Sequence, residues 1–149
     1  MKIRGFEVIS SYVTKEIVLP RRNTSGSAGY DIEAAQDITI LPGEILPCPT
    51  GLKAYMSEGE VLQVYPRSSL AVKKHLILIN SVGIIDKDYY DNESNEGHIQ
   101  IMLYNFGKEP ITILKHERVA QGIFMTFLKA DNEPSDHAKR RGGFGSTGV

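Results

Sequence analysis

The chain has 149 residues, 41% of them hydrophobic and 23% charged, a composition typical of one globular domain rather than of a disordered segment. Its formal net charge of −1 argues against a protein whose main task is to bind a nucleic-acid backbone, because such proteins carry a basic excess. The longest aliphatic stretch, Leu76–Ile79, is far shorter than the ~20 residues of a membrane span, and the N-terminus lacks an apolar segment of signal-peptide length. We therefore expect a soluble, cytoplasmic, single-domain protein with no nucleic-acid or membrane partner.

Short apolar runs alternate with turns that contain glycine or proline along most of the chain. The runs are rich in Ile, Val, Leu and Tyr, which suit a half-buried strand, and no long stretch carries a helical repeat. The predicted strands are Asp37–Leu41, Glu44–Pro47, Gly51–Met56, Val61–Tyr65, Leu76–Ile79, His98–Asn105, Ile111–Leu114 and Ala120–Phe127. This spacing predicts an all-β fold, a sandwich or barrel of the jelly-roll type.

Two early segments admit more than one interpretation. Ser27–Asp31 reads by itself as a turn followed by the start of a strand. A short helix is predicted at Ser69–Lys74, because Ser68 or Ser69 can cap its start and two lysines occupy its last turn. The backbone N–H groups, the two hydroxyls and the Arg67 guanidinium before this helix form either a phosphate cradle or a simple cap beside a solvated arginine.

The segment from Asn80 to Tyr90 is the most unusual of the chain. An apolar run turns at Val82-Gly83 and returns through Ile84-Ile85, which predicts a hairpin with Asp86 at its exit. A partly buried aspartate needs a partner or a task, although an ordinary carboxylate at a strand end is the alternative.

Polar residues near the C-terminus are also ambiguous. Gln121 lies within the last apolar strand and faces either solvent or a ligand. After Leu128 the chain becomes polar and ends in a Gly-rich sequence from Arg140 to Val149. That end is either a frayed tail or a segment that folds over a phosphorylated ligand with its arginines and N–H groups.

Taken in order, these segments resemble the signature of the trimeric dUTPase family, the deoxyuridine triphosphate nucleotidohydrolases. The matching motifs are Ala28-Gly29-Tyr30-Asp31, Pro66-Arg67-Ser68-Ser69, Gly83-Ile84-Ile85-Asp86-Lys87-Asp88-Tyr89, Arg118-Val119-Ala120-Gln121 and Gly142-Gly143-Phe144-Gly145-Ser146-Thr147-Gly148. The resemblance implies a jelly-roll-like β-barrel over residues 1–128. It also implies a C-terminal arm over residues 129–149 that closes over a neighbouring subunit's site in a homotrimer with shared active sites.

The family's reaction is the attack of water on the α-phosphorus of dUTP, which gives dUMP and pyrophosphate, keeps dUTP low and supplies dUMP for dTMP synthesis. The resemblance assigns the role of general base to Asp86 and a supporting role to Asp31, and it implies Mg²⁺ held mainly by the substrate phosphates and water. The residues it assigns to the phosphates are Arg67, Ser68, Ser69, Gln121, Arg140, Arg141, Ser146 and Thr147. Those it assigns to uracil and deoxyribose are Asn80, Gly83, Ile85, Tyr89 and Phe144.

Further roles follow from the same resemblance. The backbone of the turn before Asp86 presents its polar groups to the uracil edge, Tyr89 stacks on the deoxyribose and excludes a 2′-hydroxyl, and Phe144 stacks on the uracil when the arm closes.

The chain departs from the usual family pattern at two places. Residues Tyr90–Gly97 form a longer polar loop, similar to that of some relatives from Gram-positive bacteria and their phages. The arginine of the last motif often stands where this chain has Lys139, so that Arg140 or Arg141 takes its role here, with Arg140 preferred.

Two other functions compete with hydrolysis of dUTP. Some phage relatives bind a regulatory protein through the nucleotide-site surface, in addition to or instead of hydrolysis. A dCTP deaminase has the same barrel and trimer, but its active-site pattern contains a catalytic glutamate, and the segment Gly83–Tyr89 favours dUTP hydrolysis over deamination.

Overall fold

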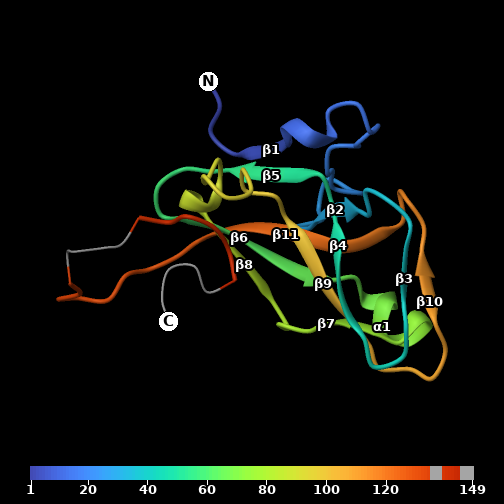
Figure 1. Ribbon diagram of the computed structural model, residues 1–149. Helices are drawn as coiled ribbons and strands as arrows, with labels where there is room; N and C mark the ends of the chain where they lie inside the picture. Colours follow the sequence, from blue (N-terminus) through green and yellow to red (C-terminus); the bar gives the residue numbers. More distant parts are fainter. Residues whose placement is uncertain (135–138, 145–149) are drawn as a thin grey trace.

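The structure is a computed structural model that describes residues 1–134 and 139–144 (Figure 1). Its strands are β1 (Gly5–Val8), β2 (Tyr30–Glu33), β3 (Ile38–Ile40), β4 (Ile45–Pro49), β5 (Leu52–Tyr55), β6 (Glu60–Pro66), β7 (Leu76–Leu78), β8 (Gly83–Asp86), β9 (Gln100–Asn105), β10 (Ile111–Ile113) and β11 (Arg118–Thr126). One α-helix, α1 (Ser68–Lys74), and two short 3₁₀ helices, η1 (Ser10–Tyr12) and η2 (Lys87–Tyr89), complete the described part of the chain. No helix in these residues is long and apolar enough to cross a membrane.

The strands form small antiparallel sheets that wrap around a common interior (Figure 1). The largest has the order β2-β11-β6-β8, a second has the order β4-β9-β7, and β10 with β3 and β1 with β5 form two-stranded ribbons. Neighbours within each sheet are distant in the sequence, as expected for jelly-roll connections. The predicted all-β architecture is therefore confirmed.

The buried core consists of the inward-facing residues of several strands. In β9 the buried residues alternate with partly exposed ones, so that Ile101 and Leu103 point inward while Met102 and Tyr104 point to the other face. The side chain of Asn105 is also fully buried, and its Nδ2 donates to the carbonyl oxygens of Ile40 and Glu109 at 2.9 and 2.8 Å. These bonds satisfy a buried amide and fix the turn that follows β9.

Each predicted strand is present with bounds shifted by a few residues, and the predicted helix begins one residue earlier, at Ser68. The expected capping by Ser68 or Ser69 is wrong, because Arg67 occupies the N-cap position and no side chain makes a capping hydrogen bond. The serine hydroxyls at the start of α1 are therefore not used as helix caps.

The prediction of a hairpin over Asn80–Asp86 is also wrong in one respect. β7 pairs with β9, and β8 pairs with β6, so the two strands on either side of the turn belong to different sheets. The turn itself is closed by hydrogen bonds from Ser81 N–H to the Leu78 carbonyl oxygen at 3.1 Å and from Val82 N–H to the Asn80 carbonyl oxygen at 2.7 Å. The chain thus crosses between two sheets here, and a pocket forms where they diverge.

Candidate active site

A pocket of about 280 Å³ lies between the turn before β8 and strand β9, close to the lower end of the size range of small-molecule sites. Its lining comes from the turn and β8, from residues 99–102, and from Arg140, Gly143 and Phe144 of the arm. All the residues predicted to contact uracil and deoxyribose line it: Asn80, Gly83, Ile85, Tyr89 and Phe144.

Sequence reasoning missed the wall formed by β9. Gln100 and Met102 line the pocket, although neither lies in a motif. The alternation of buried and partly exposed residues along β9 places both on the face opposite to the core, and this is the signal that identifies them.

Tyr89 forms the end of the pocket, and its ring is almost completely buried. Its hydroxyl donates to the carbonyl oxygen of His98 at 2.6 Å and accepts a hydrogen bond from Nδ2 of Asn95 at 2.9 Å. Burial raises the pKa of the Tyr89 phenol above its ordinary value of 10.0, which keeps it a neutral donor. Gly143 of the arm lies against this ring, where an added Cβ would come within 3.0 Å of Cε1 of Tyr89.

Asp86 ends β8 and presents a half-exposed carboxylate beside the pocket. Arg140, which lines the pocket, donates from Nη2 to Asp86 at 2.6 Å and from Nε to Asp88 at 2.6 Å. The structure therefore brings two predicted site residues, Asp86 and Arg140, into direct contact. Arg141 points elsewhere, with its Nε 3.4 Å from Oε1 of Glu93 on the polar loop.

A second cluster of predicted residues gathers around Asp31. One carboxylate oxygen of Asp31 lies 3.7 Å from Nε of Arg67, and the other lies 3.3 Å from Nη1 of Arg118. Gln121 is the register partner of Asp31 across β2 and β11. Gly29 packs directly on Gln121, because a Cβ at this position would come within 2.3 Å of the Gln121 amide oxygen.

This second cluster places the motifs around Asp31, Arg67 and Gln121 side by side, with Ser68 and Ser69 directly after Arg67 at the start of α1. Arg118 also belongs to this cluster. It was not among the predicted phosphate-binding residues, although it lies in the same motif as Gln121.

The two clusters stay apart within one chain. Asp86 is the register partner of Val61 near one end of β6, whereas Arg67 follows Pro66 at the other end. At about 3.4 Å per residue, roughly 17 Å of strand separates Val61 from Pro66. The predicted residues Ser146 and Thr147 lie outside the described residues.

Comparison with known proteins gives the family directly. The dUTPase family model matches residues 15–148. The chain belongs to the dUTPase family. The resemblance drawn from the ordered motifs is thereby confirmed.

Relatives in this family are similar over nearly the whole chain. A deoxyuridine 5′-triphosphate nucleotidohydrolase from Lactococcus lactis is 58% identical over 150 residues, which cover 100% of both chains. The crystal structure of a dUTPase from Streptococcus mutans is 49% identical and superposes with a TM-score of 0.83, covering 86% of this chain and 99% of that chain.

A more distant structure supports the fold alone. A dUTPase from phage phi11 of S. aureus is 18% identical, with a TM-score of 0.73 over 91% of this chain and 98% of that chain. That structure reveals the coordination of a structural Mg(II) ion.

The described residues of this dUTPase chain contain no group of three or more His, Cys, Asp or Glu side chains placed to hold a metal ion. Asp86 and Asp88 are both bound by Arg140, and Asp31 lies between Arg67 and Arg118. Each of these three carboxylates is thus paired with at least one arginine.

Proposed function

We propose that this member of the dUTPase family hydrolyses dUTP to dUMP and pyrophosphate, and so keeps dUTP low and supplies dUMP for dTMP synthesis in the cytoplasm. The observation that carries the proposal is the convergence of the predicted uracil and deoxyribose residues on one pocket, with Asp86 linked to that pocket by Arg140.

The turn and β8 provide the discrimination between bases. Residues of the turn and β8, among them Asn80, Gly83 and Ile85, line the pocket, and we propose that the backbone of this segment presents donors and acceptors to the edge of uracil. Cytosine carries the reversed pattern at this edge and leaves buried groups unpaired, at a cost on the order of 1–3 kcal/mol for each group. Phe144 stacks on the uracil when the arm is closed.

Asp86 acts as the general base. It accepts a proton from water as the water oxygen forms a bond to the α-phosphorus, and the bond from that phosphorus to the bridging oxygen breaks, with the electron pair leaving on pyrophosphate. Arg140 contacts only Oδ2 of the Asp86 carboxylate, so that Oδ1 is the oxygen we assign to accept this proton.

The cluster around Asp31 provides the charges that hold the phosphates. The guanidinium of Arg67, the hydroxyls of Ser68 and Ser69, and the amide of Gln121 stabilise the charge that develops on the α-phosphoryl group. Asp31 supports Arg67 through their contact at 3.7 Å. We assign the γ-phosphate to Arg140 or Arg141 together with Ser146 and Thr147.

We propose that Mg²⁺ is held mainly by the substrate phosphates and by water, since this ion keeps several waters and binds substrate phosphates in many nucleotide sites. When bound, it neutralises and orients the triphosphate. We assign to Asp31, which contacts Arg67 and Arg118, a supporting role: it orders either the water shell of the ion or the Arg67 guanidinium.

We infer that a complete site needs more than one chain. Asp86 and Arg67 are separated along β6. A neighbouring subunit of a homotrimer therefore supplies the cluster around Asp31, with its phosphate-binding residues, to the uracil pocket of this subunit. In this division residues 1–128 form the barrel and residues 129–149 form the arm. In the single chain described here the arm lies on the pocket of its own barrel, through Arg140, Gly143 and Phe144, and we propose that in the trimer it closes over a neighbour's site instead. A regulatory protein partner stays a prediction, and nothing favours deamination of dCTP.

Hydrolysis in ¹⁸O-labelled water with Mg²⁺ tests this function and its point of attack. We expect dUTP to give dUMP and pyrophosphate, with the label in dUMP. Label in the pyrophosphate would contradict attack on the α-phosphorus, and the absence of both products would contradict the proposed function.

A further inference from the structure

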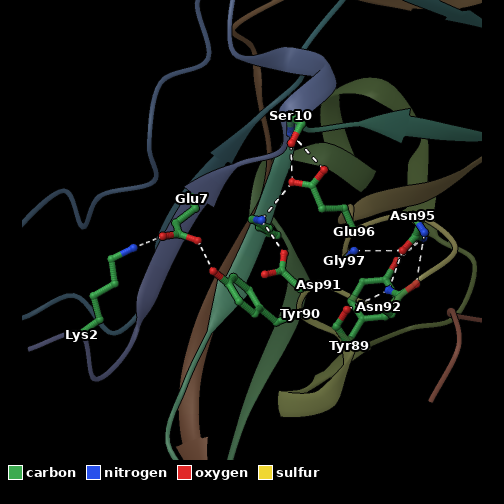
Figure 2. Close-up of polar contacts among 11 residues, drawn as sticks. Lys2, Glu7, Ser10, Tyr89, Tyr90, Asp91, Asn92, Asn95, Glu96 and Gly97 are labelled. Carbon is green, nitrogen blue, oxygen red and sulfur yellow. Dashed lines mark hydrogen bonds and ion pairs between the residues drawn. The ribbon is translucent and has the colours of Figure 1, made fainter. Parts of the chain in front are cut away.

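The polar loop Tyr90–Gly97 makes hydrogen bonds to both the carbonyl oxygen and the hydroxyl of Tyr89 (Figure 2). A buried tyrosine hydroxyl needs only one partner to avoid a desolvation penalty. Tyr89 has two: it donates to the His98 carbonyl oxygen at 2.6 Å and accepts from Nδ2 of Asn95 at 2.9 Å. The ring is therefore held at its hydroxyl by two groups rather than by one.

Asn95 is itself fixed by its neighbours in the loop. Its side-chain oxygen accepts hydrogen bonds from Nδ2 of Asn92 at 2.7 Å and from Gly97 N–H at 3.0 Å. These two bonds turn the amide nitrogen of Asn95 toward the hydroxyl of Tyr89, as Figure 2 shows. The orientation of the amide follows from the hydrogen-bond network.

Asn92 connects this amide to the backbone on both sides. Its Nδ2 also donates to the Tyr89 carbonyl oxygen at 2.8 Å, and its side-chain oxygen accepts from Ser94 N–H at 3.0 Å and from Asn95 N–H at 3.1 Å. The side chain is only 8% exposed, so these bonds are shielded from water.

The far side of the loop is attached to the barrel by an ion-pair cluster. The ammonium of Lys53, on β5, lies 2.5 Å from Asp91 and 2.9 Å from Glu96. The Glu96 carboxylate also accepts from Ser10 N–H at 3.0 Å (Figure 2). Lys53 is 9% exposed, so the paired charges fix both ends of the loop.

Gly97 allows the loop to close at this point. Its φ is +90°, and a Cβ there would come within 2.8 Å of the Tyr89 carbonyl oxygen. The close approach brings Asn95 within reach of the Tyr89 hydroxyl.

We propose that Asn95, held by Asn92, is a positioning residue that fixes the Tyr89 ring against the deoxyribose and thereby sets the rejection of ribonucleotides. The inference rests on the proposed function. The Tyr89 ring excludes the ribose 2′-hydroxyl only if the ring cannot move away from it. Two hydrogen bonds at the Tyr89 hydroxyl restrict the movement of the ring more than one bond would. Asn95 contacts neither Asp86 nor the phosphate cluster, so it acts on sugar selectivity rather than on the chemical step.

The test compares kcat/KM for dUTP and for UTP in the natural chain and in Asn95→Ala. We expect the ratio between the two substrates to fall about tenfold in the variant, with kcat for dUTP within about threefold of the natural value. Ser94→Ala is the matched control, because it removes a contact to Asn92 in the same loop but no contact to Tyr89. This control should keep the natural ratio.

Tyr89→Phe removes the hydroxyl while leaving the bonds of Asn95 to Asn92 and Gly97 intact, and it tests the proposal even if Asn95→Ala fails to fold. We expect Tyr89→Phe to lower the ratio as Asn95→Ala does, and the double variant to add nothing further. An unchanged ratio in either single variant, or an additive loss in the double variant, would overturn the inference while the natural chain still hydrolysed dUTP. A natural chain that did not hydrolyse dUTP would overturn the proposed function, and the inference with it.

Discussion

Arg140, a residue of the arm, forms an ion pair with Asp86, the proposed general base. The Asp86 carboxylate is 46% exposed, and exposed ion pairs of this kind contribute about 0–1 kcal/mol to stability. Loss of this ion pair should therefore have little effect on the folding of the barrel.

Replacing Asp86 by Asn should lower the rate of dUTP hydrolysis by at least about 10²–10⁴-fold, because a positioned general base contributes roughly that factor. The denaturation midpoint should stay close to that of the natural chain. Steady-state kinetics and thermal denaturation measure the two quantities. Asp88→Asn, which removes the other carboxylate held by Arg140, is the control and should cause a smaller loss. An Asp86→Asn variant with natural activity would exclude Asp86 as the base.

His98 gives the fold a dependence on pH. Burial holds the pKa of the His98 imidazole below its ordinary value of 6.5, against the opposing effect of the nearby Glu96, and its Nε2 accepts a hydrogen bond from Gly51 N–H at 3.0 Å. The unfolded chain therefore binds a proton at a higher pH than the folded chain does.

The free energy of unfolding should fall as the pH decreases from about 6.5 through the lower folded pKa of His98, since protonation removes the acceptor for Gly51. Denaturant unfolding at several pH values between 7 and 5 measures this slope. His98→Gln, which keeps an acceptor but does not titrate, should flatten it, and His75→Gln at an exposed position should not. A slope that His98→Gln leaves unchanged would assign it to other groups.

At the scale of elements, the sequence predicts the strands with a clear apolar run and misses those without one. β1 has no fully buried residue, and the sequence did not predict it. β2 has four residues, and the sequence predicted only that a strand starts after the turn at Ser27–Asp31. Both are stabilised by partners far along the chain, β5 for β1 and β11 for β2, which no local pattern reports.

The error over the hairpin has the same origin. The turn at Val82-Gly83 is real, but the choice of strand partners depends on β6 and β9, which lie outside the segment. The pocket residues that lie in motifs could be predicted because the order of the motifs along the chain resembles that of the family. The contact between Arg140 and Asp86, and the wall formed by Gln100 and Met102, depend on the path of the whole chain.

The arm should act on binding of the base more than on stability. Phe144 is 72% exposed although it lines the pocket, so its ring is free to stack on a uracil. Aromatic stacking on a base is worth about 1–3 kcal/mol, so Phe144→Ala should raise KM for dUTP roughly 5- to 150-fold.

Steady-state kinetics on Phe144→Ala measure this effect, with thermal denaturation as the check on folding. Phe106→Ala is the control, because Phe106 is an exposed aromatic residue that packs on His75 away from the pocket. Equal KM values for Phe144→Ala and the natural chain would show that the arm does not contact the base.

At the scale of the whole molecule, the separation of Asp86 from Arg67 is the feature with the widest consequence. The two residues lie at opposite ends of β6, although both are assigned to one reaction. Sequence motifs report which residues serve the site but not which chain supplies them, so the sharing of sites came from the family resemblance alone.

Mixing the inactive variants Asp86→Asn and Arg67→Ala, unfolding them together and refolding them should restore activity. In a randomly assembled trimer with shared sites, about a quarter of the sites receive both natural residues. The recovered rate should approach that fraction of the natural rate, and mass measurement should give a trimer. A mixture as inactive as each variant alone would place both residues of a site on one chain.

The central claim is hydrolysis of dUTP in a pocket that reads the uracil edge. The most direct measurement is pyrophosphate release with Mg²⁺ from dUTP, dCTP, dTTP and UTP in parallel, for the natural chain. The account predicts rapid release from dUTP and release from the other three at rates at least about a hundredfold lower. The edge of cytosine leaves buried groups unpaired, and the 2′-hydroxyl of UTP meets the Tyr89 ring. The 5-methyl group of thymine must fit into a pocket of about 280 Å³ that we propose closes around uracil. Release from dCTP or UTP at a rate similar to that from dUTP, or no release from dUTP by the folded protein, would contradict it.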